Sequence, residues 1–291
     1  MTIYNLGSIN IDMVHQVPHL PIPGETLVAK SFSQGLGGKG ANMSVAAARA
    51  GARIRHIGAI GVDGHWAVTR LLEYGVDVEH ITEVSEVTGH AIISVDESAE
   101  NSIVLWPGAN HRLEVDQIGA ALAQADTGDT LLMQNETTGQ LVAAQMAKDL
   151  GFKIAYAAAP FEANAVKALL PYIDLLFLNE VEAAQLEKEI GKPINGLSVE
   201  NVIVTLGADG CRWFSNSTRL ETSFNAVKVE PIDTTGAGDT FTGYVVAGLD
   251  RGMPMAQAIK LATQASAIMV KRLGTADVIP DLKDVQDAKL G

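Results

Sequence analysis

The sequence predicts an α/β protein with a mostly parallel central sheet, helices on both faces and a small additional β-sheet that forms a lid. Short apolar segments with strand character alternate with longer stretches of helical periodicity, which is typical of parallel strands joined by covering helices. The clearest strand and helix pairs are 131–133 with 137–150, 154–156 with 164–170, and 175–178 with 180–190.

Two segments break this alternation, because they contain extended pieces and no helical pattern. Residues 11–34 carry Pro18, Pro21 and Pro23, and residues 89–106 form a hairpin pattern around 96–101. We therefore assign 11–34 and 89–106 together to the small lid sheet. The chain shows no repeat and no polar linker, and one core can serve a chain of about 250–300 residues. We expect a single domain over 1–291.

Composition excludes several classes of partner. The net charge of -13 would repel nucleic acid and anionic membranes. The single Cys211 cannot form an intrachain disulfide, the first residues lack a basic region followed by an apolar stretch, and no run approaches the roughly 18 apolar residues of a membrane span. We expect a cytoplasmic protein that binds neither nucleic acid nor membrane.

The first polar positions that could bind a ligand follow the N-terminal strand, 3–6. Asn10 and Asp12 come after the turn Gly7-Ser8, at the carboxyl edge of the sheet, where ligands of open α/β sheets bind. A surface turn favours the same residue types, so both interpretations stay open at this point.

The loop 35–40 contains the pattern G-x-G-x-x-G. A dinucleotide-binding fold requires a buried strand directly before the glycines, and 31–34 is a poor one, which excludes a dehydrogenase of that type. The residue after Lys39 is not Ser or Thr, so the loop is not a P-loop. What remains is a close turn before a helix over 41–50. Lys39 and Asn42 could hydrogen-bond a polyhydroxy ligand there, although Asn42 could equally be a helix cap.

Asn179 and Glu182 lie three residues apart at the start of a helix that follows the strand 175–178. Both can project from one face towards the same edge of the sheet. An amide and a carboxylate are hard oxygen ligands, suited to a hydrated magnesium ion that shields nucleotide phosphates.

The stretch Asp233-Thr234-Thr235-Gly236-Ala237-Gly238-Asp239-Thr240 places glycines where a loop becomes a helix. Free N–H groups and the positive end of the helix dipole point out of such a loop, and glycine lets an anion approach them. Asp239 could take a proton from an attacking hydroxyl beside that anion. An ordinary Gly-rich turn would have the same composition, so this segment alone leaves both readings open.

Taken in order, these patches resemble the ribokinase family of carbohydrate kinases, also called the PfkB family, over essentially the whole chain. The two signatures of the family are similar to Gly37-Gly38-Lys39-Gly40-Ala41-Asn42 and to the stretch 233–241. Asn179-Glu180-Val181-Glu182 is similar to its N-x-x-E motif, and Thr205-Leu206-Gly207-Ala208-Asp209-Gly210 to its nucleotide-binding turn. The segments 7–12, 107–110 and 134–136 resemble those of the members that phosphorylate ribose.

The resemblance implies a ribokinase-like fold and an ATP-dependent enzyme that phosphorylates the O5 hydroxyl of D-ribose. It implies that Asp239 is the catalytic base and that Gly236, Ala237 and Gly238 stabilise the transferring charge. It assigns the sugar to Asn10, Asp12, Gly38, Lys39, Asn42 and Glu136, the nucleotide to Asn179, Thr205, Gly207 and Gly210, and Mg²⁺ to Asn179 and Glu182. It assigns an activating potassium ion to Asp233 and Thr235, and to Arg272 and Gly274 through their carbonyl groups.

This chain departs from the family at the potassium site, because Val278 stands where a Ser is common. The resemblance also implies a homodimer, in which the small sheet is both interface and lid. A kinase for another sugar or for a nucleoside is the main alternative, and Trp106 could offer a surface for a base. A sugar-binding protein without activity is a more distant alternative. Such a protein would not need the glycine-rich anion-binding loop or the catalytic Asp239, and this sequence retains both.

Overall fold

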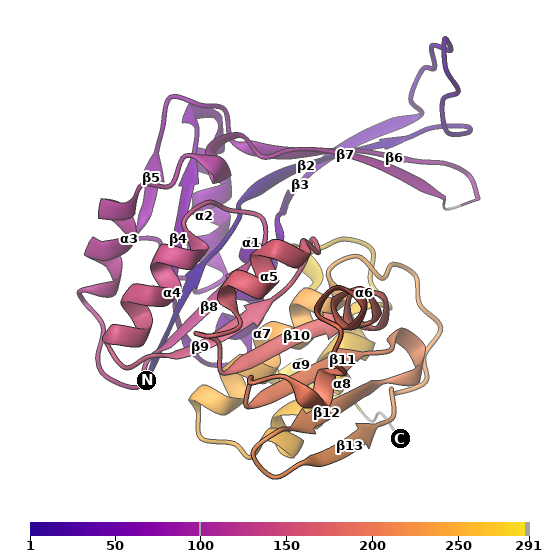
Figure 1. Cartoon of the computed structure of the whole chain (residues 1–291). Coiled ribbons are helices and arrows are strands. Elements are labelled where there is room, and N and C mark those ends of the chain that lie inside the picture. Colours follow the sequence, from indigo (N-terminus) through magenta and orange to yellow (C-terminus); the bar gives the residue numbers. More distant parts are fainter. Residues whose placement is uncertain (99, 289–291) are drawn as a thin grey trace.

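A nine-stranded sheet forms the centre of the computed structural model, which describes residues 1–98 and 100–288 (Figure 1). Its strand order is β13-β12-β11-β10-β9-β8-β1-β4-β5, and only the pairs β11·β12 and β12·β13 are antiparallel. The predicted mostly parallel sheet is therefore confirmed, with an antiparallel edge. Its strands are β1 Thr2–Leu6, β4 Arg53–Ile60, β5 Ile81–Glu83, β8 Thr130–Gln134, β9 Lys153–Ala157, β10 Leu175–Asn179, β11 Asn201–Thr205, β12 Cys211–Ser215 and β13 Leu220–Phe224.

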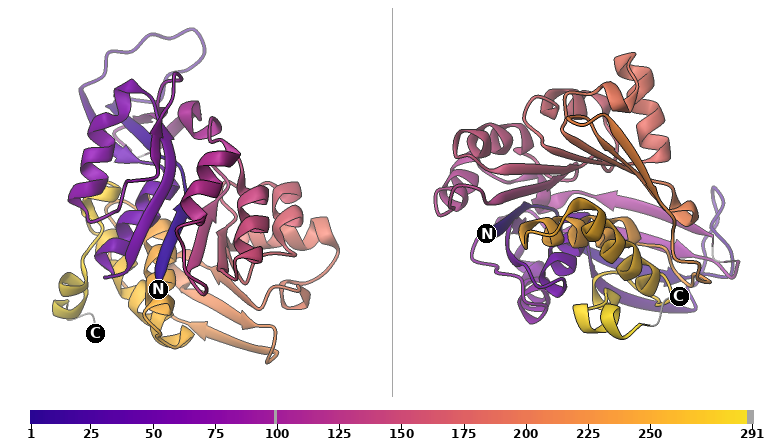
Figure 2. Two further views of the ribbon diagram at one scale, coloured as in Figure 1. Left: turned by 90° about the vertical axis from the view of Figure 1, so that its left-hand side faces the viewer. Right: turned by 90° about the horizontal axis from the view of Figure 1, so that it is seen from below.

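Helices cover both faces of this sheet, as the turned views show (Figure 2). Successive side chains of a strand point to opposite faces, so Ile3 packs into one core and Tyr4 into the other. The first core is covered by α1 Lys39–Arg49, α2 His65–Glu73, α7 Ala237–Asp250, α8 Met255–Met269 and α9 Leu282–Asp287. The second is covered by α3 Val115–Leu122, α4 Gln140–Asp149, α5 Ala163–Leu169 and α6 Glu180–Ile190.

The segments that broke the alternation form a second sheet, which projects from the body (Figure 1, upper right). Its order is β3-β2-β6-β7, with β2 Asn10–Gln16, β3 Ser31–Gly37, β6 Gly89–Val95 and β7 Asn101–Trp106. β2 pairs antiparallel with β3 and parallel with β6, where Asn10 lies opposite Gly89. The predicted small sheet is thus present. The single-domain extent over 1–291 stays a prediction, and its last residues, 289–291, lie outside the described part.

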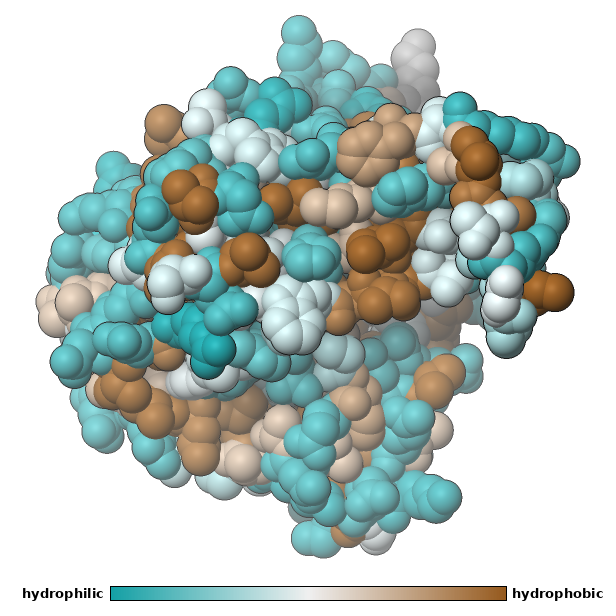
Figure 3. All heavy atoms as spheres, turned by 90° about the horizontal axis from the view of Figure 1, so that it is seen from above, coloured by the Kyte–Doolittle hydropathy of each residue, from teal (hydrophilic) through white to brown (hydrophobic). Residues whose placement is uncertain are grey.

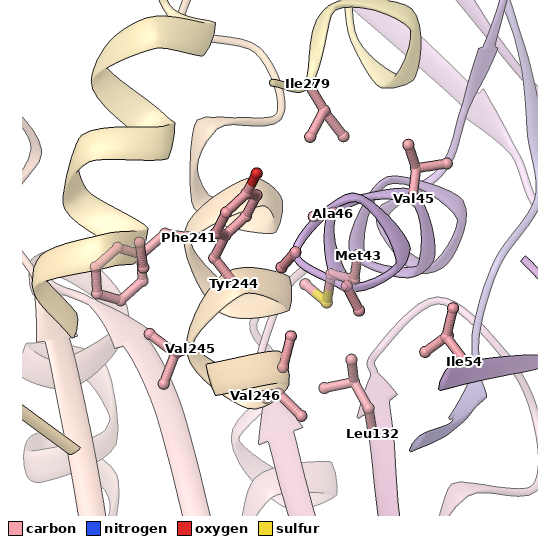
Figure 4. Close-up of a cluster of buried hydrophobic side chains, with 14 of the residues drawn as sticks. Met43, Val45, Ala46, Ile54, Leu132, Phe241, Tyr244, Val245, Val246 and Ile279 are labelled. Atoms are coloured by element: carbon pink, nitrogen blue, oxygen red, sulfur yellow. The ribbon is translucent and has the colours of Figure 1, made fainter. Parts of the chain in front are cut away.

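Contact between α1 and α7 brings the two signature motifs together (Figure 4). A Cβ at Gly243 would lie 2.6 Å from the Cβ of Ala46 and 2.7 Å from the carbonyl oxygen of Met43, so only glycine permits this approach. Tyr244 adds a hydrogen bond of 2.7 Å to the carbonyl of Pro280. The starts of both helices therefore reach the same edge of the sheet.

Two helix starts differ by two or more residues from the predicted ones, for a reason in the backbone. α1 begins at Lys39, before the predicted 41, because Gly38 with φ 93° ends the loop there. α4 begins at Gln140, after the predicted 137, because Gly139 has φ 86°. No helix in the described ranges has the length and hydropathy needed to span a membrane.

Candidate active site

Asp239 and Asn42 connect the two signature motifs directly. Asp239 lies in the first turn of α7 and is 8% exposed, and its Oδ2 accepts a hydrogen bond of 2.9 Å from Asn42 Nδ2. Burial raises the pKa of Asp239, while the Lys39 ammonium and the Asn42 hydrogen bond oppose that shift. The Asn42 Oδ1 is buried and has no partner among the described residues. Asn42 can therefore orient Asp239 and still accept a hydrogen bond from a ligand.

Glu136 organises the turn on the other side of Lys39. Its Oε2 accepts the backbone N–H of Lys39 at 3.0 Å and the hydroxyl of Ser8. The attraction of Asp239 raises the pKa of Lys39, burial opposes this shift, and the charges of Glu136 and Glu182 add to it. The Lys39 ammonium therefore interacts electrostatically with carboxylates from three separate parts of the fold.

Asp12 enters the same space from the small sheet. It is 9% exposed, and burial, with smaller contributions from the charges of Glu136 and Asp239, raises its pKa to about 7. A Cβ at Gly37 would lie 2.1 Å from the Asp12 carboxylate, so the glycine makes room for this acid. Asn10, at the start of β2, accepts a hydrogen bond of 2.8 Å from Asn110.

The start of α7 offers free backbone donors. Gly236 has the left-handed conformation with φ 76°, which turns the chain into the helix. The N–H groups of Gly238 and Asp239 have no partner in the described part of the chain, and a Cβ at Gly238 would meet nothing within 4 Å. An anion can therefore approach these donors from open space.

A pocket of about 640 Å³ begins on the far side of Gly238. Three of the predicted nucleotide residues, Thr205, Gly207 and Gly210, line it, and Thr263 and Ser266 of α8 form the opposite wall. Residues 226–229 also line it, and no sequence motif pointed to them. The lining is mainly apolar and suits a flat heterocycle beside the anion-binding turn.

Asn179 and Glu182 form the N-terminal cap of α6. The Asn179 Oδ1 accepts the N–H of Glu182, and Glu182 Oε2 accepts the N–H of Asn179, both at 2.8 Å. Burial raises the pKa of Glu182, and the Lys39 charge opposes the shift. Within the described ranges, no group of three or more His, Cys, Asp or Glu side chains is placed to hold a metal. Glu182 Oε1 remains free for a hydrated ion.

Asp233 joins the anion-binding turn to the loop after α8. Its Oδ1 accepts the N–H of Thr235 at 2.9 Å, and its Oδ2 accepts the N–H of Gly274 at 3.2 Å. The Arg272 side chain points elsewhere, towards the carbonyl of Val278 and the carboxylate of Asp284. Of the predicted cation residues, Arg272 is thus available only through its backbone.

Apart from the nucleotide residues in the pocket and the cap residues Asn179 and Glu182, the predicted site residues fall into three neighbouring groups. The sugar-side group surrounds Lys39, the phosphate group lies at Gly236–Gly238, and the cation group lies behind it at Asp233. Sequence reasoning missed Ser8 and the fixing role of Asn110. Both lie inside segments already noted for their resemblance. Their hydrogen-bond partners, Glu136 and Asn10, are distant in sequence, so the fold is needed to identify them.

Comparison with known proteins agrees with this geometry. Residues 2–282 match the model of the pfkB family carbohydrate kinases. A ribokinase of Haemophilus influenzae is 39% identical, with 96% of this chain and 95% of the relative covered. The crystal structure of a ribokinase from Thermotoga maritima superposes with a TM-score of 0.89 at 32% identity, covering 98% of each chain. The structure of an Arabidopsis thaliana ribokinase complexed with ribose and ATP gives 0.83 at 26%, covering 98% of this chain and 97% of that one. The chain therefore belongs to the pfkB family of carbohydrate kinases, enzymes that transfer a phosphoryl group to a hydroxyl.

Proposed function

We propose that this chain is an ATP-dependent kinase that phosphorylates the O5 hydroxyl of D-ribose to give ribose 5-phosphate and ADP. The observation that carries the proposal is the position of Asp239, which bonds to Asn42 beside Lys39 and lies in the first turn of α7 next to the free N–H of Gly238. Relatives named ribokinase support the choice of sugar, and the Arabidopsis thaliana structure was solved with ribose and ATP.

In the proposed reaction, Asp239 accepts the O5 proton as that oxygen attacks the γ-phosphorus. The new O5–P bond forms in line with the bond between the γ-phosphorus and the ADP oxygen. That bond breaks, and the ADP oxygen keeps its electron pair. The N–H groups of Gly236 and Gly238, which are free within the described part of the chain, stabilise the charge on the transferring group, whereas the N–H of Ala237 donates to the carbonyl of Thr234 at 3.2 Å and can contribute only by reorienting. The ammonium of Lys39 interacts with Asp239 and Glu182, so it adds positive charge between acceptor and donor.

The sugar would be held from two sides. Asp12 and Asn10 come from the small sheet, while Asn42 and Glu136 come from the main body. The free Asn42 Oδ1 supplies an acceptor for a hydroxyl, and an ionised Asp12 can accept from two neighbouring hydroxyls. This density of hydrogen-bonding groups favours a sugar over a nucleobase at this position, because a missing hydroxyl leaves buried groups unpaired.

Mg²⁺ would be held mainly by the nucleotide phosphates. Glu182 fits such an ion because it keeps one carboxylate oxygen free, whereas the Asn179 oxygen already caps α6. When bound, the ion neutralises charge on the phosphates. A magnesium ion that retains most of its waters needs only one or two protein carboxylates.

A potassium ion would fit next to Asp233, whose carboxylate joins the two loops that the resemblance assigns to it. The Val278 side chain faces Gly274 and offers no oxygen, so we propose a weakened site made of the Asp233 carboxylate and backbone carbonyls of Thr235, Arg272 and Gly274. When bound, the ion adds positive charge behind the anion-binding turn.

We also propose a two-fold homodimer through the small sheet. One face of this sheet carries Asp12, and strand alternation places a row of exposed apolar side chains on the other. Hydrophobic residues are visible in both halves of the view in Figure 3, including the right-hand half, where the small sheet lies. The exposed apolar residues of that face are Phe32, Ile92, Val104 and Trp106.

A second copy of the same sheet would cover this face. The small sheet would then serve as a lid over the sugar, anchored by its partner. Light scattering at micromolar concentration tests the dimer, with Ile92→Glu as the variant expected to separate the subunits. A monomer of about 31 kDa in the wild type would contradict it. That the enzyme is cytoplasmic, where its donor is made, stays a prediction.

The reaction is tested with a panel of sugars and nucleosides supplied with ATP. We expect D-ribose to give the highest kcat/KM and 2-deoxyribose a lower one. Asp239→Asn should reduce turnover by about two to four orders of magnitude with ATP binding nearly unchanged. A nucleoside with a higher kcat/KM would leave the phosphoryl transfer in place but change the acceptor. No turnover with any acceptor would favour a sugar-binding protein without activity.

A further inference from the structure

A chain of four buried polar side chains lies beneath the sugar side of the site. Its members are Asn5 of β1, Ser44 of α1, His56 of β4 and Gln134 of β8, and none exposes more than 1% of its surface. None of them contacts the reacting groups in the proposed reaction. Polar side chains in such a layer are unfavourable unless each is hydrogen-bonded, so their partners indicate what they do.

The amide of Asn5 is the centre of the chain. Its Nδ2 donates to Ser44 Oγ and to the carbonyl of Gly40, both at 2.8 Å. Its Oδ1 accepts from Gln134 Nε2 at 2.7 Å. The Asn5 side chain thus links the strands β1 and β8 to the first turn of α1.

His56 continues the chain to the turn after β1. Because Ser44 Oγ accepts from Asn5, its hydrogen is available to His56 Nδ1, 2.8 Å away. The proton of the ring then lies on Nε2, which donates to the carbonyl of Gly7 at 3.0 Å. Burial lowers the pKa of His56 to about 4, so the ring stays neutral, with one donor and one acceptor.

The series of hydrogen-bonded side chains ends on two glycine carbonyls next to the sugar site. Gly7 precedes Ser8, and Gly40 follows Lys39, and both neighbours donate hydrogen bonds to Glu136. The two glycines are in direct backbone contact, since a Cβ at Gly40 would lie 2.4 Å from the Gly7 Cα. They have no side chains, so their backbone groups fix them: the N–H of Gly7 donates to the carbonyl of Ile57 at 3.1 Å, the N–H of Gly40 donates to Ser8 Oγ at 3.2 Å, and both carbonyls accept from the buried side chains.

We propose that Asn5, Ser44 and His56 are positioning residues for the sugar site. They hold the carbonyls of Gly7 and Gly40, and these in turn set where Ser8 and the Lys39 N–H meet Glu136. The inference rests on the proposed function in one respect, that Glu136 binds the sugar. The competing explanation is that the chain only satisfies its own buried groups and stabilises the fold.

The first test is His56→Phe, which keeps an aromatic ring of similar size and removes both hydrogen bonds. We expect the KM for ribose to rise about tenfold while the KM for ATP changes less than about twofold. His56→Gln, whose amide can donate to Gly7, should restore most of the ribose KM. The matched control is His80→Phe, because the buried His80 has an Nε2 without a partner in the described part of the chain. An unchanged ribose KM in His56→Phe would overturn the proposal.

The double variant Ser44→Ala/His56→Phe separates positioning from stability. It removes the hydroxyl that His56→Phe leaves without its acceptor, but it also takes away one of the two acceptors of Asn5 Nδ2, so thermal stability should fall below that of His56→Phe. The Gly7 carbonyl lacks its donor in both variants, so the ribose KM should stay close to that of His56→Phe. A ribose KM that rises further as stability falls would show that the hydrogen-bonded side chains are only structural.

A measurement without substrate keeps this inference separate from the proposed function. Amide hydrogen exchange over residues 37–42 should be faster in His56→Phe than in the wild type, with residues 153–157 of β9 as the internal reference. If the wild type does not phosphorylate ribose, the proposed function is refuted. The hydrogen-exchange result over residues 37–42 then still decides whether His56 has the positioning role. Unchanged exchange over 37–42 would overturn it.

Discussion

Acid should weaken sugar binding through Asp12. The carboxylate has a pKa of about 7 because it is buried and lies near the charges of Glu136 and Asp239. The ionised form is the one proposed to accept sugar hydroxyls, so the binding-competent fraction should fall as pH decreases through this value. The apparent KM rises in inverse proportion to that fraction. A single group with a pKa of about 7 is about nine-tenths ionised at pH 8 and one-tenth at pH 6, which gives an increase of about tenfold.

The assay is the initial rate against ribose concentration, at saturating Mg-ATP and constant ionic strength, between pH 6 and 8. The kcat should change less than the KM, because saturating sugar selects the ionised form of Asp12. Asp12→Asn should have a high ribose KM that no longer depends on pH in this range. The reasoning would be refuted by a wild-type KM that is the same at pH 6 and 8, or by an Asp12→Asn variant with the wild-type profile.

A second variant tests the cause of the shift. Glu136→Gln removes one of the like charges near Asp12, so the pKa of Asp12 should fall and the midpoint of the KM profile should move to lower pH. The ribose KM itself should rise, since Glu136 is proposed to bind the sugar. The midpoint is therefore the quantity to compare, and a midpoint at higher pH would contradict the electrostatic account.

Three further predictions concern the surroundings of the site. Gly40→Ala places a Cβ 2.3 Å from the backbone nitrogen of Ser8; it should lower the free energy of unfolding by about 1–3 kcal/mol in urea and raise the ribose KM, whereas Gly196→Ala should do neither. Glu182→Gln can keep the cap of α6 but loses the charge, so the KM for Mg-ATP should rise about tenfold at nearly constant Tm, whereas Glu182→Ala should also lose about 1 kcal/mol of stability. Potassium should activate more than sodium or a bulky organic cation at equal ionic strength, and Val278→Ser should lower the concentration needed; equal rates in all three cations would mean that no functional site exists.

Local pattern was enough to predict the main sheet, because its strands are short apolar runs between helices of clear periodicity. It also predicted the small sheet, from two segments that lacked helices. It did not reveal that β2 and β6 pair in parallel, with Asn10 opposite Gly89, since this pairing joins residues distant in sequence. The pocket wall at 226–229 was missed for a related reason, because an irregular loop has no periodicity to detect.

The series of buried, hydrogen-bonded side chains around His56 also could not be predicted from local sequence pattern. A sequence reader can see that Asn5 interrupts an apolar strand and that His56 lies in another. Which groups satisfy them depends on the register of β1 with β4, which places Asn5 opposite His56, and on α1 lying across both. Polar residues in buried strands therefore indicate that they hydrogen-bond to another buried group. The fold is needed to show which group that is.

The hydrogen bond between Asn42 and Asp239 explains why the two signature motifs must act as one unit. A base at the centre of a buried site has conflicting requirements, since burial raises its pKa and favours the neutral acid, whereas proton transfer needs the carboxylate. Lys39 and Asn42 both stabilise the ionised form, and both come from the first turn of α1. The motif proposed to bind the sugar thus also stabilises the ionised form of Asp239, the proposed base. A displacement of α1 by even a small distance should weaken both proposed functions together, so the tight contact of α1 with α7 at Gly243 is expected to matter for catalysis as well as for stability.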